Sequence, residues 1–329
     1  MFGKRGKWIL ALAALGCLIV SFVVGRYPLS LGEIGRILLG QDADSVPARV
    51  FLNIRLPRAL IVSVCGMGLA VAGQIFQRVF VNPLVSPDVL GVSGGCSVGA
   101  VAAILAGAGM WATQAFAFMG GLCAVGLSIL LARAIRGERR ISMILSGIII
   151  GALANAVIMF FKYVADPTNE LATIEYWLMG SFHTARWVDL RLLVPMTAIC
   201  FLGLFLLRYP IQIIALGDEE AKSLGVNVPR VRAVALFLAT ALVAASVCVA
   251  GIVSWVGLIV PHMVRRVSHR DSTLFIESAM GGAAVLTVAD ALARSIATAE
   301  IPISILTSLM GAIFLAAVLL ARQRGTARD

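Results

Sequence analysis

Charged side chains are scarce in this chain of 329 residues. Asp, Glu, Lys and Arg make up 13% of it, whereas 60% is hydrophobic. Ordinary soluble domains carry about 25% charged residues, so too few are present here to cover even one soluble domain of the expected size. The shortage excludes a soluble globular protein, a disordered protein and a secreted disulfide scaffold. A protein that crosses a membrane several times remains.

Motifs for catalysis, nucleotide binding and metal binding are lacking as well. The phosphate-binding pattern G-x-x-x-x-G-K-[ST] is absent, which indicates that the chain does not itself hydrolyse ATP. The six cysteines lie in apolar runs without a C-x-x-C pair, so we interpret them as small buried hydrophobic side chains. The three histidines lack the spacing of zinc ligands. We therefore expect no catalytic residue, no metal site and no cofactor.

Long apolar runs dominate what is present. A helix needs about 20 apolar residues to cross the hydrocarbon layer, and ten segments are candidates: 8–25, 58–77, 91–109, 112–132, 142–162, 189–207, 231–249, 251–264, 275–296 and 302–321. The eighth is short, and its Gly251, Gly257 and Pro261 favour a broken or re-entrant helix. Such backbone is tolerated at membrane depth only where protein or water covers it. The sequence predicts an all-α membrane protein with one transmembrane domain over residues 1–329.

The basic residues predict an orientation. With ten spans, both chain ends lie on one side of the membrane. If that side is the cytoplasm, eighteen of the 27 Lys and Arg residues lie inside and nine outside. This distribution agrees with the positive-inside rule, by which cytoplasmic loops carry an excess of Lys and Arg. This predicts cytoplasmic N- and C-termini, and it accounts for the net charge of +10 without nucleic acid as a partner.

The loop at residues 208–232 contains a short predicted helix. Asp218, Glu219 and Glu220 stand at its start, where carboxylates suit the positive end of the helix dipole, and Gly225 is a suitable end. One interpretation is a cytoplasmic helix that docks into a groove on a soluble partner. The other is a solvated charged loop.

Two further charged groups lie near membrane-spanning segments. Arg55 and Arg58 flank the start of the second span on the outer side, where they could extend to lipid headgroups or meet an acidic external partner. Asp290 and Arg294 are one helical turn apart in the ninth span, in the favourable order. Ionisable residues inside a span often mark a lumen or a partner site, and a purely structural pair is the alternative.

Several of these stretches together resemble the FecCD-type permeases, the membrane subunits of ABC importers for ferric siderophores, haem and cobalamin. The matching stretches run in order over residues 50–320: Arg55-Leu-Pro-Arg58, Gly73-x-x-x-Gln77, Asn82-Pro-Leu84, Leu90-Gly-Val-Ser93, Tyr176-Trp-Leu-Met-Gly-Ser181, Leu216-Gly-Asp-Glu-x-Ala-x-x-Leu-Gly225, Gly251-Ile-Val-Ser-Trp-Val-Gly-Leu-Ile-Val-Pro-His262-x-x-Arg265, Asp290 to Arg294, and Ile301-Pro302.

The resemblance implies a type II ABC importer permease with ten helices per subunit, working by alternating access. Its implied partners are two ATPase subunits, a periplasmic or lipid-anchored substrate-binding protein and a second permease copy, forming a homodimer in the cytoplasmic membrane. It implies three sets of site residues: a coupling helix for the ATPase (Gly217, Asp218, Glu219, Glu220, Ala221, Leu224, Gly225), cations for docking of the binding protein (Arg55, Arg58, Arg294), and an inner gate (Arg140, Ile141, Ser142).

Three alternatives remain at the level of sequence. Some relatives with this architecture carry oxyanions such as molybdate, so an oxyanion is an alternative cargo. A stand-alone secondary carrier should show ion-coupling carboxylates in its spans, and only Asp290 is a candidate. A membrane-embedded enzyme should show a cluster of His, Ser or carboxylate residues, and none stands out. Because the binding protein supplies most of the selectivity in this family, the sequence does not distinguish among siderophore, haem, cobalamin and oxyanion.

Overall fold

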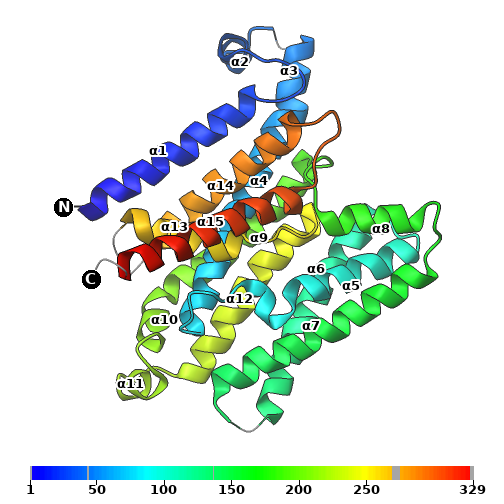
Figure 1. Cartoon of the computed structure of the whole chain (residues 1–329). Helices are drawn as coiled ribbons and strands as arrows, with labels where there is room; N and C mark the ends of the chain where they lie inside the picture. Colours follow the sequence, from blue (N-terminus) through cyan, green and yellow to red (C-terminus); the bar gives the residue numbers. More distant parts are fainter. Residues whose placement is uncertain (1, 43, 136, 269–274, 327–329) are drawn as a thin grey trace.

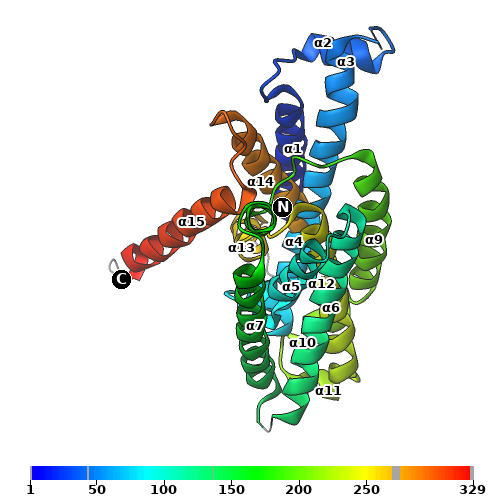
Figure 2. The same cartoon turned by 90° about the vertical axis from the view of Figure 1, so that its right-hand side faces the viewer.

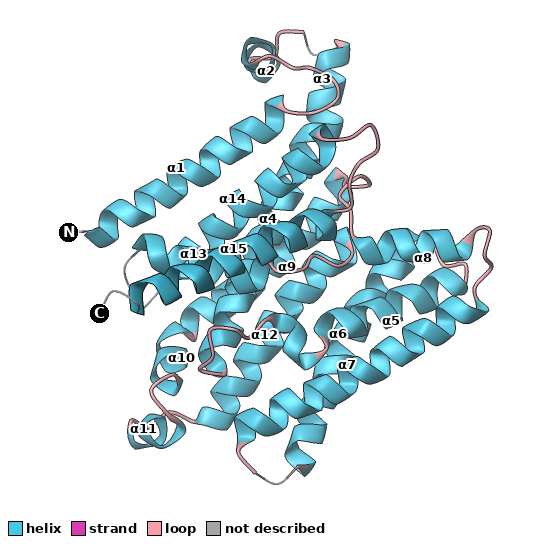
Figure 3. Cartoon of the chain, in the orientation of Figure 1, coloured by secondary structure: helices cyan, strands magenta, loops and turns pink. Residues whose placement is uncertain are grey.

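The computed structural model describes residues 2–42, 44–135, 137–268 and 275–326, and within these ranges the chain forms helices and no strand (Figure 3). The elements in order are α1 (Phe2–Val23), α2 (Leu31–Leu38), α3 (Val46–Val50), a π-helical turn η1 (Phe51–Arg55), α4 (Leu56–Val79), a 3-10 turn η2 (Pro87–Leu90), α5 (Val92–Leu105), α6 (Met110–Ala134), α7 (Arg139–Val164), α8 (Glu170–Met179), α9 (Trp187–Leu206), α10 (Arg208–Ile214), α11 (Asp218–Ser223), α12 (Val228–Ala250), α13 (Val256–Ser268), α14 (Phe275–Ser295) and α15 (Ile303–Thr326).

Each of the ten predicted segments contains a helix. Seven helical stretches among the described residues are long and apolar enough to cross a membrane: Gly6–Val23, Val46–Val79, Met110–Ala134, Arg139–Val164, Trp187–Leu206, Val228–Ala250 and Phe275–Ser295. Two shorter apolar stretches are Val92–Leu105 and Ile303–Val318. The predicted all-α architecture of a multi-pass membrane protein is confirmed.

The break predicted in the eighth segment is present. Residues 251–255 are irregular, with Gly251 and Trp255 both at φ +70°, and α13 then runs for only 13 residues with Pro261 inside it. Pro261 cannot donate a hydrogen bond to the preceding turn. The backbone break is enclosed by protein, since Ser181 N donates to Ala250 O and Ser304 Oγ to Ile252 O, which accords with the requirement that irregular backbone at membrane depth be covered.

The long helices run side by side, and short helices mark the two ends of the bundle (Figure 1). We call the end with α2 and α3 the α2 end and the opposite end, with α10 and α11, the α11 end. A view turned by 90° shows α15 standing away from α6 and α7 (Figure 2). Arg136, Arg270 and Arg328, which contribute to the predicted charge bias, lie outside the described residues.

The core surrounds α4, which packs against α9, α12, α13 and α14. Small residues allow this close packing, as is usual between membrane helices. A Cβ atom on Gly66 would lie 2.3 Å from the carbonyl oxygen of Gly282 on α14, and one on Gly73 would lie 1.8 Å from that of Gly257 on α13. Neither position can hold a larger residue without moving the backbone.

Three short helices lie outside both the predicted segments and the loop at residues 208–232. The first, α2, begins with a capping box in which Ser30 Oγ accepts from Glu33 N while Glu33 Oε2 accepts from Ser30 N, an arrangement that satisfies two free donors of the first turn. The others are α3 and α8. Together with η1, α3 extends α4 beyond the predicted start of the second span.

One expectation for the cysteines is wrong in part. Cys65, Cys96 and Cys200 are buried, as expected, but Cys123 is exposed and Cys17 and Cys248 are only partly buried. The exposed Cys123 lies on α6, a helix long enough to span the membrane, where lipid rather than protein provides the apolar surroundings.

Candidate functional site

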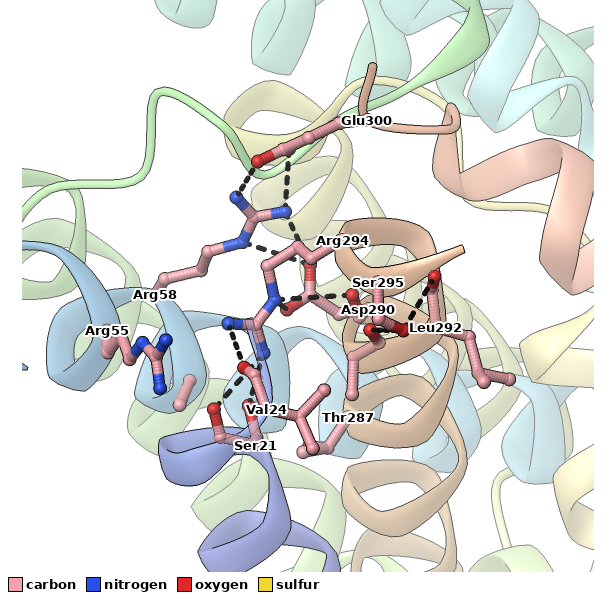
Figure 4. A network of polar contacts seen from close by, with 12 residues as sticks. Ser21, Val24, Arg55, Arg58, Thr287, Asp290, Leu292, Arg294, Ser295 and Glu300 are labelled. Carbon is pink, nitrogen blue, oxygen red and sulfur yellow. Dashed lines mark hydrogen bonds and ion pairs between the residues drawn. The ribbon is translucent and has the colours of Figure 1, made fainter. Parts of the chain in front are cut away.

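The predicted docking residue Arg58 is held between two carboxylates at the α2 end (Figure 4). Its Nε and Nη2 donate to Asp290 Oδ1 at 3.0 and 2.8 Å, and its Nη1 and Nη2 donate to the Glu300 carboxylate at 2.9 Å each. The planar guanidinium thereby joins α4, α14 and the loop before α15. Charge-assisted bonds with this geometry are among the stronger ones in proteins.

Arg294 ties α14 to the end of α1. Its Nη2 donates to Ser21 Oγ at 2.8 Å and its Nη1 to Val24 O at 3.2 Å (Figure 4). Its Nε lies 3.0 Å from Asp290 Oδ2, an ion pair in which that oxygen receives no well-aligned hydrogen bond. The intrahelical pair predicted from the spacing of Asp290 and Arg294 is therefore present, and Asp290 serves two arginines at once.

Arg55 uses a different set of partners at the same end. It closes the π-helical turn η1, and its guanidinium donates to Phe22 O at 2.6 Å, to Val23 O at 2.7 Å and to Tyr27 O. The carbonyls at the end of a helix have no partner within the helix. Arg55 therefore caps α1, and it binds the same end of α1 that Arg294 reaches.

The three arginines predicted to dock a binding protein are gathered within one region but are not displayed on the surface. Arg55, Arg58 and Arg294 are 4%, 6% and 7% exposed, because α1, α14 and the loop at Glu300 occupy their guanidinium groups. Their docking role stays a prediction, and it requires an incoming carboxylate to compete with an internal one.

Glu300 is the internal partner most open to such competition. Its side chain is 25% exposed, whereas that of Asp290 is 1% exposed. Burial raises the pKa of the Glu300 carboxyl, but the hydrogen bonds from Arg58 outweigh this effect and hold that pKa below its ordinary value. Glu300 is thus ionised at neutral pH and pairs with Arg58 as a full charge. The sequence signal for it was weak, since Glu300 stands alone in a loop.

At the opposite end, the predicted coupling residues form α11 and its flanks. Gly217 precedes α11 at φ +145° and Gly225 follows it at φ +77°, backbone conformations that favour glycine. Ala221 is buried against Ile214 and Val228, whereas Leu224 is exposed. The helix thus has one side packed on the protein and one side free.

The three acidic residues at the start of α11 point to different partners. Asp218 faces inward and binds Arg140 Nη2 at 3.0 Å and Arg232 Nη2 at 2.8 Å. Glu219 is exposed and pairs with Lys222 at 2.8 Å on the same helix, and Glu220 is exposed as well. Only the last two carboxylates are therefore free to meet another protein.

Asp218 connects the predicted coupling helix to the predicted inner gate. Arg140 is in the first turn of α7, beside the exposed Ile141 and the buried Ser142, and Arg232 is in the first turns of α12. Partial burial raises the pKa of the Asp218 carboxyl, but hydrogen bonds from Arg232 and Arg140 outweigh it and hold the pKa below the ordinary value. The pairing is complete at neutral pH and is lost only as the pH falls through that lowered pKa.

A polar contact between α4 and the broken segment was not predicted from the sequence. Gln77 Nε2 donates to Leu258 O at 3.1 Å, and Gln77 Oε1 accepts from Arg265 Nη2 at 2.8 Å. Gln77 lies one turn after Gly73, where α4 and α13 nearly touch. The pattern Gly73-x-x-x-Gln77 is thus explained by contact with the stretch that contains Arg265.

One cavity has a volume of about 780 Å³. It lies among α5, α6, α8 and the end of α12, and its polar lining includes Gln114, Tyr176 and His183. Tyr176 Oη and Ser181 Oγ are each hydrogen bonded to His183 Nδ1, at 3.3 and 3.2 Å. Among the residues that the structure describes, no group of three His, Cys, Asp or Glu side chains is arranged to hold a metal ion.

Known proteins match this chain along nearly its whole length. Residues 12–321 match the model of the FecCD transport family. The molybdate import system permease protein MolB of Haemophilus influenzae is 34% identical over 312 residues, which cover 93% of each chain. The hemin transport system permease protein HmuU of Yersinia pestis is 36% identical over 318 residues, covering 92% of this chain and 90% of its own.

A solved structure agrees with the sequence relatives. It is described as a metal-chelate type ABC transporter in an inward-facing conformation, is 33% identical and superposes with a TM-score of 0.88 over 97% of this chain and 99% of its own. The helical architecture, the length of the match and the family model lead to one assignment. The chain belongs to the FecCD transport family and is a multi-pass permease subunit of an ABC importer.

Proposed function

We propose that this permease moves an iron chelate (a ferric siderophore or haem) or cobalamin across the cytoplasmic membrane by alternating access, with energy from two separate ABC ATPase subunits. The observation that carries the proposal is the connection made by Asp218, which bonds α11 to both α7 and α12. A short helix with a free outer face and a fixed inner face is suited to transmit movement from a soluble partner to the bundle.

In this proposal α11 is the coupling helix. Glu219, Glu220 and Leu224 are its exposed side chains and contact the ATPase. When ATP binding moves the ATPase, α11 moves with it, and Asp218 pulls Arg140 at the start of α7. Because Ile141 and Ser142 follow directly, the inner gate opens or closes with the coupling helix. Packed helices of this kind shift between discrete arrangements rather than deform continuously.

The substrate-binding protein docks at the α2 end. Acidic side chains on that protein approach Arg55, Arg58 and Arg294, and Glu300 gives way to the incoming carboxylate because it is the exposed partner of Arg58. Charge complementarity of this type sets the docking orientation and the association rate more than the affinity. The proposal places the α2 end outside the cell and the α11 end, with both termini, in the cytoplasm.

A second copy of the permease completes the pathway. The support is α15, which stands away from α6 and α7 (Figure 2) and carries the exposed apolar side chains Ile305, Leu309 and Ile313. Between α13, α14 and α15 lies an almost entirely apolar cavity of about 460 Å³. A homodimer interface over this surface would bury these side chains. The mass of the purified protein in detergent shows whether it is a monomer or a dimer.

An oxyanion such as molybdate is the second candidate for the cargo. A relative named as a molybdate permease favours this cargo, because its similarity to this protein extends over 93% of both chains. The relative named as a hemin permease is 36% identical over a similar length, so sequence identity does not rank the two cargo classes.

Uptake by cells tests the proposal and identifies the cargo. Cells lacking this gene and complemented cells are given radiolabelled iron with a panel of siderophores, labelled haem, cobalamin or molybdate. Restored, energy-dependent uptake of one iron chelate or cobalamin supports the primary proposal. Restored uptake of molybdate alone keeps the architecture and replaces the cargo. Equal uptake of every compound by both strains contradicts the proposed cargo classes.

A further inference from the structure

A basic pocket lies at the α11 end, between the end of α6 and the starts of α7, α11 and α12. Its volume is about 230 Å³, and its charged lining consists of Arg133, Arg139, Lys222, Arg232 and Asp218. Four cations therefore face one carboxylate. That carboxylate is already bound by Arg140 and Arg232, and Lys222 pairs with Glu219. Among the described residues, the charges of Arg133 and Arg139 are left without a counterpart.

Two of the four cations of the pocket lack an acidic partner among the described residues, and a third has an unsatisfied donor. Arg133 and Arg139 form no ion pair with any side chain in the part of the chain that the structure describes. Arg232 is 5% exposed, and its buried Nε has no hydrogen-bond partner among the described atoms. A buried donor without a partner costs free energy, and an anion in the pocket is the kind of group that would remove this cost.

Two helix starts add to the positive potential. α7 begins at Arg139 and α12 at Val228, and both residues line the pocket. Their first-turn N–H groups and dipoles favour an anion. Two arginines in the first turn of α7, Arg139 and Arg140, are unfavourable there by themselves, which makes a neutralising anion more favourable still.

The rest of the lining is apolar and continues onto the outer surface of the bundle. Ile129 and Met143 belong to the pocket. Leu130, which follows Ile129, and Ile141, two residues before Met143, are exposed. A free phosphate would contact only the cations. A phospholipid would contact the cations with its headgroup and the apolar side chains of α6 and α7 with an acyl chain.

We propose that this pocket binds the phosphate of an anionic phospholipid from the membrane leaflet at the α11 end. The inference rests on the proposed orientation, which makes this the cytoplasmic leaflet. Basic pockets between membrane helices on that side are suited to anionic headgroups. Because the pocket shares Asp218, Lys222 and Arg232 with α11 and its contacts, the bound lipid steadies the coupling helix.

Lipid binding to the full-length protein in nanodiscs or detergent tests the inference. Labelled phosphatidylglycerol is titrated against labelled phosphatidylcholine, with inorganic phosphate as competitor. The variant Arg133→Gln/Arg139→Gln should lower the affinity for phosphatidylglycerol by about 25-fold, at a factor of about five for each cation. Arg230→Gln is the matched control, because Arg230 is exposed at the start of α12 but does not line the pocket.

A single variant and a second readout keep the result decisive. Lys222→Gln changes an exposed side chain and should lower affinity by about fivefold. Equal affinity of the double variant and the Arg230→Gln control overturns the inference, as does full displacement of lipid by inorganic phosphate. If the double variant keeps its affinity for the lipid but no longer co-purifies with the ATPase, the inference is also overturned. That result indicates that an acidic side chain of the ATPase occupies the pocket. Because lipid binding needs neither cargo nor ATPase, failure here leaves the proposed transport function to its own test.

Discussion

The side chains of Arg58, Asp290 and Arg294 form one buried charged cluster, with the partly exposed Glu300 at its edge. Breaking a buried ion pair by removing one partner costs about 3–5 kcal/mol, because a buried charge is left behind. Asp290 therefore holds the cluster together, and in the proposed docking Glu300 is the member that changes partners. This division between a fixed and an exchangeable carboxylate is what a docking site for an acidic partner requires.

Removing the charge of Glu300 tests that division. In Glu300→Gln, Arg58 keeps its ion pair with Asp290. The charged Glu300 side chain no longer competes with an incoming carboxylate for Arg58. We expect the affinity for the substrate-binding protein to rise by up to about fivefold, since partly exposed ion pairs contribute about 1 kcal/mol. Glu175→Gln is the control, because Glu175 pairs with Lys162 away from the arginines. Weaker binding by Glu300→Gln in a surface-binding assay would show that Glu300 itself contacts the partner.

The exposed carboxylates of α11 give a second prediction. Glu219→Ala/Glu220→Ala removes both free acids of α11 while leaving Asp218 and its two arginines in place. Co-purification of the ATPase subunits should fall several-fold, without loss of membrane insertion. Glu138→Ala, an exposed acid at the same end but outside α11, should have no effect. Equal co-purification by all three proteins would contradict the coupling-helix assignment.

At the scale of elements, close contact between α4 and α13 depends on glycine. In Gly73→Ala the new methyl group would meet the carbonyl of Gly257, and overpacking of this kind costs about 1–3 kcal/mol. The melting temperature in detergent should therefore fall. Gly126→Ala provides the comparison, because Gly126 lies within α6 with open space around it, and alanine there should be neutral. A melting temperature that is the same for both variants would refute the close contact.

The membrane-spanning segments could be predicted from the sequence because a run of apolar residues is a local property. The break before α13 was also predictable, from Gly251, Gly257 and Pro261. The short helices α2 and α8 were missed because they have only 8 and 10 residues, fewer than the apolar run that marks a membrane span, although the Ser30 and Glu33 spacing of a capping box was a readable signal.

The contacts that make the candidate sites could not be predicted in the same way. Arg58 and Asp290 are 232 positions apart, and their meeting depends on how α4 and α14 are rotated about their axes. Hydropathy places a helix in the membrane but does not fix that rotation. The contact between Asp218 and Arg140 could not be predicted for the same reason, although Asp218 was assigned to the coupling helix and Arg140 to the inner gate.

At the scale of the whole molecule, charged groups are concentrated at the two ends, and the bundle between them is apolar and tightly packed. The α2 end holds Arg58 and Arg294 in internal ion pairs, of which the Glu300 carboxylate is the most exposed member. The α11 end joins the exposed helix to α7 through Asp218.

The most direct test of this account is the amount of cargo moved per ATP hydrolysed by the reconstituted importer in proteoliposomes, compared between wild type and Asp218→Asn. We predict that wild-type uptake requires both ATP and the ATPase subunits. The variant should still bind the ATPase and hydrolyse ATP, but it should move several-fold less cargo for each ATP, because α11 no longer pulls α7. Wild-type uptake without ATP, or an unchanged ratio in Asp218→Asn, would contradict the account.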